Sequence, residues 1–244
     1  MDLKTLFKIE YIKLFRRSNV LFLFLFIYMC IPGTWSFESR GFAAGLNFFE
    51  QTVLYVSVFF GILLMSIFIL NNTGNDFNEN SYRKNLADGM TKQDYSKGKF
   101  LLIIFFTIFV ITFTLFVYFL FGSFTFNMTF TQLTSYISAI SLINQFIALF
   151  YAGLFGLFFF LVFRNRIIGL VFIPFWGFTE FIFFILENSG TIKLYIDYMP
   201  LKACYNLYNS HVFDLKALVV VVVISAIFII TSWLSLYKRE VKSN

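Results

Sequence analysis

The side chains that could do chemistry are few and scattered along the chain. Glu180 is a carboxylate deep within an apolar stretch, and His211 is the only histidine. A charge at the centre of a membrane-spanning helix costs about 2.5–3.5 kcal/mol on lenient scales, so an intramembrane carboxylate is a functional candidate by default. Glu180 could line a substrate path and meet a cationic group there. It could equally be protonated and bonded to Thr179 or a neighbouring helix for packing.

The other polar residues form no catalytic or metal-binding pattern. A single His without Cys or carboxylates at ligand spacing is typical of a surface residue, and Cys30 and Cys204 indicate no disulfide framework. The phosphate loop G-x-x-x-x-G-K-[ST] is missing, because Gly98-Lys99 is followed by Phe100 and lacks the upstream glycine. We therefore expect no enzymatic activity, no catalytic residue, no metal and no cofactor in this chain.

The composition decides which elements must position these residues. Hydrophobic residues make up 59% of the 244 positions and charged residues 13%, whereas a soluble domain is about 25% charged. Such an excess needs lipid as its solvent. Stretches of about 20 apolar residues cross a membrane as helices, and the chain has such stretches at residues 20–37, 52–70, 100–121, 139–163, 167–186 and 215–237. The sequence thus predicts an all-α integral membrane protein with six transmembrane helices in a single domain, residues 1–244.

The basic residues predict the orientation of these helices. Of the 19 Lys and Arg, only Arg40, Lys193, Lys202 and Lys216 fall on one predicted side of the membrane. Lys and Arg accumulate in cytoplasmic loops, so the richer side is expected to be cytoplasmic, together with both termini. The net charge of +6 is then a topology signal, and we expect no nucleic-acid partner.

Residues 1–19 have the pattern of an amphipathic helix in the membrane interface. Apolar residues recur there at helical spacing, with Lys4, Lys8, Lys13 and Arg16 largely away from them. The residues assigned to this interfacial helix are Glu10, Lys13, Arg16 and Arg17. Such a helix would contact membrane lipid through its basic groups. The alternative is a simple positively charged anchor for the first span.

Two other segments lie outside the predicted spans. Residues 71–99 interleave acidic and basic residues and are far longer than a plain connection. A mixed-charge helix there would be suited to contact another protein, and the alternative is a solvated loop. Residues 187–214 lie on the opposite, outer side and carry His211 and several aromatic residues.

The segment 71–99 resembles the membrane subunits of the type-2 ABC exporter family. The resemblance is carried by residues 75–86 (NDFNENSYRKNL) and 88–92 (DGMTK), followed by Tyr95 and Lys99. The family tends to have an acidic residue, a Gly-Thr pair and a basic residue here, then a Gly-x-Ser/Thr-basic turn. Asp76 stands where the family usually has Glu, and Asn80-Ser81 replaces Gly-Thr. The six-span plan and residues 9–14 are also similar to the family.

This resemblance implies that residues 71–99 are a coupling helix seated in a separate ATP-binding subunit, which would bind ATP and Mg. The implied contact residues are Asp76, Glu79, Arg83, Lys84, Asp88, Thr91 and Lys92, with Arg164 and Arg166 as a second, smaller contact. It further implies short re-entrant outer helices within 187–214, a second permease copy or a sister permease, and a bacterial cytoplasmic (inner) membrane.

The resulting prediction is a permease subunit of an ATP-driven ABC exporter. It would move an amphipathic or apolar substrate by alternating access. The alternatives are a self-contained ion-coupled carrier or channel and a membrane-embedded lipid-modifying enzyme. Carriers often show broken helices and intramembrane charges, and Pro174 and Glu180 hint in that direction.

Overall fold

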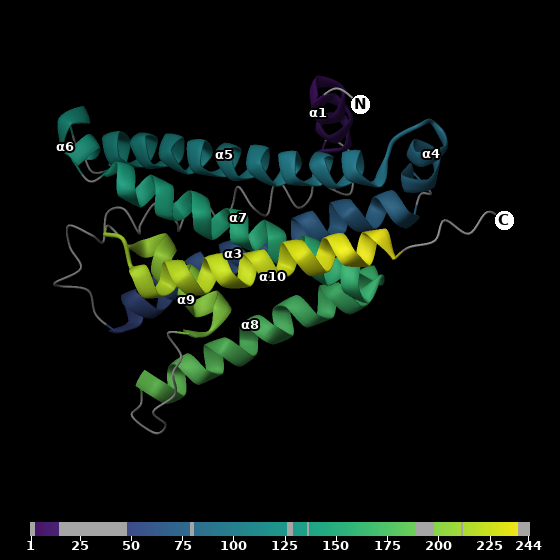
Figure 1. Cartoon of the computed structure of the whole chain (residues 1–244). Helices are drawn as coiled ribbons and strands as arrows, with labels where there is room; N and C mark the ends of the chain where they lie inside the picture. The colour runs from purple at the N-terminus through teal and green to yellow at the C-terminus, as the bar shows by residue number, and fades with distance from the viewer. Residues whose placement is uncertain are drawn as a thin grey trace.

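The computed structural model describes residues 3–14, 48–78, 81–125, 129–135, 137–188, 198–210 and 212–238, and their regular elements are helices (Figure 1). These are α1 (Leu3–Leu14), α3 (Phe48–Asn78), α4 (Ser81–Ala87), α5 (Lys92–Thr125), α6 (Phe130–Ser135), α7 (Ala139–Phe163), α8 (Arg166–Asn188), α9 (Pro200–Asn209) and α10 (Leu215–Tyr237). The predicted all-helical class is confirmed for this part of the chain.

Within the described residues, α5, α7, α8 and α10 each contain a stretch long and apolar enough to cross a membrane. The chain is therefore a multi-pass membrane protein. Four of the predicted spans lie in these helices. The predicted span 52–70 lies within α3, which is helical without interruption, while 20–37 lies outside the described residues; crossings at these two places stay predictions.

Helix α7 is the centre of the bundle. It packs against α3, α5, α8, α9 and α10, and it lies between them in Figure 1. Its apolar window is 67% buried inside the protein, whereas those of α8 and α10 are 22% buried. The outward faces of α8 and α10 are consequently apolar and exposed, as expected for helices that border lipid.

Small residues bring α3 and α7 together. A Cβ added at Gly156 would collide with the backbone carbonyl oxygen of Ser66, and the Ser66 hydroxyl donates to the carbonyl of Ala152 at 2.7 Å. Gly153 faces Ile103 of α5 at similarly short range. In lipid the hydrophobic effect does not drive helices together, so dispersion contacts and interhelical hydrogen bonds at such close approaches stabilise the pair.

A tight turn connects α7 to α8. Arg164 ends α7 in the left-handed conformation, with φ 55°, and the side chain of Asn165 accepts hydrogen bonds from the first N–H groups of α8, at 2.8 Å from Ile167. Asn165 thus supplies the N-cap that α8 needs. The two helices are antiparallel neighbours at this end of the bundle.

The polar segment 71–99 differs from its expected form. Helix α3 continues to Asn78 and α5 begins at Lys92, so only residues 79–91 connect them, and α4 is the single short helix between. Asn71, Asn72, Thr73 and Asp76 are buried instead of solvated. The sequence showed their polarity but not that they pack against other polar groups at the end of the bundle.

Candidate functional site: a buried ion network

The polar end of α3 meets the first turns of α5 and the helix α1. Helix α1 packs against α5 near its start, at the end of the bundle where α4 and the end of α10 also lie (Figure 1). Leu6 and Glu10 are one turn apart on the buried side of α1, whereas Lys8, Tyr11 and Ile12 are exposed. Glu10 is 4% exposed, so α1 directs a carboxylate into the protein.

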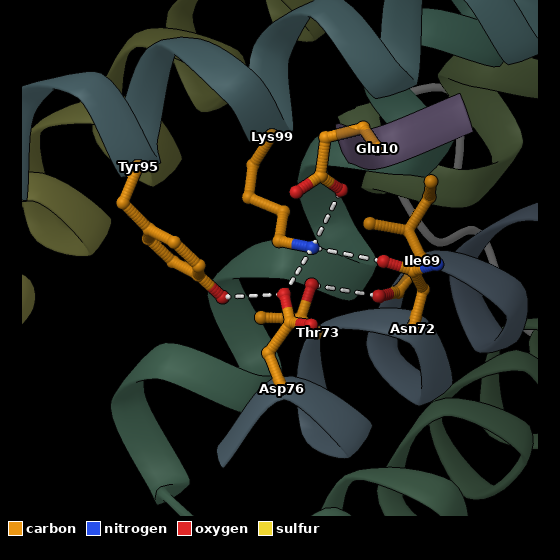
Figure 2. A network of polar contacts seen from close by, with 7 residues as sticks. All are labelled: Glu10, Ile69, Asn72, Thr73, Asp76, Tyr95 and Lys99. Atoms are coloured by element: carbon orange, nitrogen blue, oxygen red, sulfur yellow. Dashed lines mark hydrogen bonds and ion pairs between the residues drawn. The ribbon is translucent and has the colours of Figure 1, made fainter. Parts of the chain in front are cut away.

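Lys99 of α5 receives that carboxylate. Its Nζ donates to Glu10 Oε2 at 2.9 Å and to Asn72 Oδ1 at 2.8 Å, and it pairs with Asp76 Oδ2 at 2.7 Å (Figure 2). The Tyr95 hydroxyl donates to the same Asp76 oxygen at 3.4 Å. An ammonium has three N–H donors, and all three of Lys99 are used. We call Glu10, Asn72, Asp76, Tyr95 and Lys99 the Lys99 network.

The burial of these charges makes the network a single unit. Lys99 is 1% exposed and Asp76 is 0% exposed. Removing water from a charge is expensive, and only close opposite charges and hydrogen bonds offset the loss. Each ion therefore depends on the others, and the network joins three helix ends that are far apart in the sequence.

An aromatic cluster connects the Lys99 network to α4. Phe77 stacks on Tyr82 with ring centres 4.4 Å apart, and Tyr82 meets Tyr95 edge to face at 4.8 Å. Phe77 also contacts Phe160 of α7 at 5.2 Å. Tyr95 belongs to both groups, since its ring packs against Tyr82 while its hydroxyl bonds Asp76.

Helix α4 has one buried side and one exposed side. Tyr82 is buried, whereas Arg83, Lys84 and Asp88 are exposed. Gly89 follows with φ 94°, a conformation that glycine adopts without strain, and it turns the chain toward α5. The exposed side of α4 is thus basic at its centre and free of contacts that would cover Arg83 or Lys84 within the described residues.

The start of α5 is fixed by a reciprocal cap. The Thr91 hydroxyl accepts a hydrogen bond from the N–H of Asp94 at 3.0 Å, and the Asp94 carboxylate accepts from Thr91 N at 3.3 Å. This is a capping box, which satisfies two N–H groups at the helix start. Lys92 then donates to the carbonyl oxygen of Tyr237 at 3.2 Å, which brings the end of α10 to the same place.

Most of the predicted contact residues lie at one end of the bundle, one is buried, and others lie outside the described residues. Arg83, Lys84, Asp88, Thr91, Lys92 and Arg164 lie at the same end of the bundle, and Arg166 lies there too, donating to Asn75 at 2.9 Å. Asp76 is buried and so does not lie on the surface that a partner would contact. Glu79, Arg16 and Arg17 lie outside the described residues, as does the side chain of Lys13.

The pairing of Glu10 with Lys99 was missed from the sequence. The sequence places Glu10 in the predicted interfacial helix and Lys99 just before the predicted span 100–121, 89 residues later. The available signal was a lone acidic residue on the apolar side of an amphipathic helix, together with a lysine at the start of an apolar run. Burying either charge costs free energy unless an opposite charge pairs with it, and the carboxylate and the lysine carry opposite charges.

Glu180 lies at the other end of the bundle and is 4% exposed. Its carboxylate accepts from the indole N–H of Trp176 at 2.5 Å and from the backbone N–H groups of Leu201 and Lys202 at 3.3 and 2.9 Å. The bonds to Leu201 and Lys202 reach a neighbouring helix, α9, whereas Trp176 belongs to α8 itself and the Thr179 hydroxyl bonds Phe175. A role in a substrate path stays a prediction. Among the described residues, no three His, Cys, Asp or Glu side chains gather as metal ligands.

No family model, curated protein or solved structure matches the chain. The similarity to type-2 ABC exporter permeases therefore rests on the residues themselves, and the family stays a prediction. The geometry of the Lys99 network and α4 is independent of that similarity.

Proposed function

We propose that this chain is the membrane subunit of an ATP-driven exporter, and that a separate ATP-binding subunit contacts the exposed side of α4. ATP and Mg would be bound by that partner, and this chain would supply the path for an amphipathic or apolar substrate. A second copy of the chain, or a sister subunit, would complete the path in a bacterial cytoplasmic membrane.

The observation that carries the proposal is the two-sided character of α4. Arg83 and Lys84 are exposed on one side, while Tyr82 on the other side packs against Phe77 and Tyr95. Interior packing transmits displacement because it leaves little free space. A partner that pushes α4 would therefore move Tyr95 and, through Asp76, the Lys99 network.

Movement of the Lys99 network would reach the crossing helices at once. The network ties α1, the end of α3 and the start of α5, and Lys92 ties α5 to the end of α10. Alternating access requires several helices to change position together. The described contacts support this because they connect α4 to helices on more than one side of α7.

Purification of the tagged chain from its native membrane tests the proposal. An ATP-binding subunit should remain bound in gentle detergent and be identified by mass spectrometry. The double variant Arg83→Glu/Lys84→Glu should lose that subunit, since both charges lie on the exposed side of α4. Lys97→Glu is the matched control: Lys97 is also exposed and at the same end, but it belongs to α5.

A further variant separates binding of the ATP-binding subunit from the passage of movement from α4 to the Lys99 network. Tyr82→Ala removes the buried contact of α4 and leaves Arg83 and Lys84 in place, so the partner should stay bound while substrate-stimulated ATP hydrolysis falls. A chain that purifies folded and alone, and that moves substrate without ATP, would instead establish the self-contained carrier or channel.

A further inference from the structure

The outer half of α8, residues 175–188, is held to the bundle by few contacts. Beyond Pro174, the buried residues among those described are Gly177 and Glu180, while Phe175, Phe178 and Ile182 are exposed. In the view of Figure 1 this half of α8 diverges from α10. Among the described side chains of this half, Glu180 is the only buried one, while Phe181 is partly buried and packs against the core.

The first half of α8 is anchored much more firmly. A Cβ added at Gly169 would collide with the side chain of Leu70 in α3, so the two helices are in close contact there. Arg166 bonds Asn75 of α3 at 2.9 Å, and Ile173 is 0% exposed. These contacts fix the first half of α8 to α3.

Pro174 separates the two halves. Proline has no N–H, so the bond that would run to the carbonyl of Leu170 is absent, and its ring crowds the preceding turn. Sharp bends in helices occur mainly at such positions. Pro174 lies inside α8, immediately after the last residue of the anchored half and six residues before Glu180.

Glu180 connects the outer half to α9. The residue at the N-cap of α9, Met199, makes no side-chain cap bond. The Glu180 carboxylate supplies the acceptor from another helix and binds the N–H groups of Leu201 and Lys202. An anion is favourable at a helix N-terminus, where N–H groups are unsatisfied and the helix dipole is positive.

Trp176 holds the carboxylate from one turn earlier. Its indole N–H donates to Glu180, and its ring meets Phe155 of α7 edge to face at 6.3 Å. Helix α9 itself packs mainly on α7 and α10. The bond between Glu180 and α9 thus ties the outer half of α8 to the central part of the bundle.

We propose that Glu180, with Trp176 and the N–H groups of Leu201 and Lys202, is a latch whose release lets the outer half of α8 swing away about Pro174. We call this group the Glu180 latch. Opening would uncover Tyr151 of α7, which is buried near Glu180 and whose hydroxyl has no hydrogen-bond partner among the described residues. The inference does not depend on the proposed function, since it requires no ATP-binding partner.

Distance measurement between spin labels tests the latch. Ile185 near the end of α8 and Leu215 at the start of α10 are both exposed, and each is replaced by Cys and labelled in a Cys30→Ser/Cys204→Ala background. In lipid nanodiscs, the chain with Glu180 intact should give one dominant distance. Glu180→Ala should raise a longer-distance population at least about tenfold, which corresponds to about 1.4 kcal/mol.

Matched variants define what each outcome means. Thr179→Val changes the adjacent residue, whose hydroxyl bonds within α8 to Phe175, and it should leave the distances unchanged. Trp176→Phe removes only the indole donor and should give a smaller shift. Glu180→Gln, which keeps one acceptor oxygen, serves if the Ala variant fails to fold, and it should also open the latch in part.

Two results would overturn the proposal. One is an unchanged distance distribution in folded Glu180→Ala or Glu180→Gln protein. The other concerns the hinge: Glu180→Ala/Pro174→Ala should open less than Glu180→Ala alone, because Ala restores the missing bond of α8. Equal opening with and without Pro174 would show that the outer half does not bend there.

Discussion

The two ends of this bundle both bury carboxylates, and they stabilise them in different ways. Asp76 and Glu10 share the ammonium of Lys99, so one cation attracts two carboxylates across α1, α3 and α5. Glu180 has no cation within hydrogen-bond reach among the described residues and is bound by the neutral N–H groups of Trp176, Leu201 and Lys202. One end is an ion network, and the other is a helix cap supplied by a neighbouring helix.

This difference predicts how each end responds to mutation. Removing a partner from a buried ion pair leaves a bare charge, which costs more than the pair contributed. Removing a carboxylate from neutral donors leaves N–H groups unsatisfied, and the loss is that of a helix cap. The Lys99 end should therefore be rigid and intolerant, and the Glu180 end should be able to open and close.

Lys99→Met should have the largest effect. It leaves two buried carboxylates without their cation, and we expect a loss of about 3–5 kcal/mol of folding free energy, measured as a lower unfolding temperature in detergent and less folded protein in the membrane. The triple variant Lys99→Met/Glu10→Gln/Asp76→Asn removes all three charges. It should recover much of the stability; a triple variant as unstable as Lys99→Met would show that the charges are not the cause.

Gly156→Ala tests the close contact between α3 and α7. The new Cβ would collide with the Ser66 carbonyl oxygen, and overpacking of this kind typically costs about 1–3 kcal/mol. Gly61→Ala is the matched control, because a Cβ at Gly61 meets nothing within 4 Å. Thermal unfolding of both variants checks the prediction, and equal stability would contradict the close α3–α7 contact.

Glu180→Gln should destabilise the protein much less than Lys99→Met. The amide keeps one acceptor for the N–H groups of α9, and we expect a loss of about 0.5–2 kcal/mol, the range of a weakened helix cap. The same thermal unfolding measurement applies. A loss as large as that of Lys99→Met would mean that Glu180 is part of an ion network after all, and the distinction between the two ends would fail.

The smallest expected effect concerns Cys204, whose thiol should react slowly with thiol reagents in the folded protein. Burial raises the pKa of the Cys204 thiol well above its ordinary value, with the Glu180 charge adding to the rise. Because the thiolate is the reactive form, the reactive fraction is lower at every pH than for an exposed cysteine. In Cys30→Ser protein, maleimide labelling at pH 8 should be slow until the chain is unfolded.

An exposed cysteine provides the control for that measurement. Val212 is 69% exposed at the same end of the bundle, and Val212→Cys in a Cys30→Ser/Cys204→Ala background should label rapidly. Similar rates at both positions would show that α9 leaves its place on the timescale of the reaction. That outcome would favour a frequently open Glu180 latch in the unmodified protein.

Several features followed from the sequence because they depend on composition and local pattern. The excess of apolar residues predicted a helical membrane protein, and the runs at 100–121, 139–163, 167–186 and 215–237 lie in helices able to cross a membrane. The predicted spans 139–163 and 167–186 leave three residues between them, and a tight turn connects α7 to α8 there. The polarity of residues 71–99 was visible, but most of that segment lies in the ends of α3 and α5, with α4 between them.

The pairing of polar groups was decided only by the tertiary structure. Nothing local distinguishes Asp76, which is buried with Lys99, from Asp88, which is exposed; the difference is that α1 and α5 cover one of them. Glu180 was visible as an intramembrane carboxylate, but its partners are N–H groups of α9, 21 and 22 residues later. Apolar burial depends on residue type and spacing, whereas the neutralisation of a buried charge depends on which distant groups the packed helices bring within about 3 Å of it.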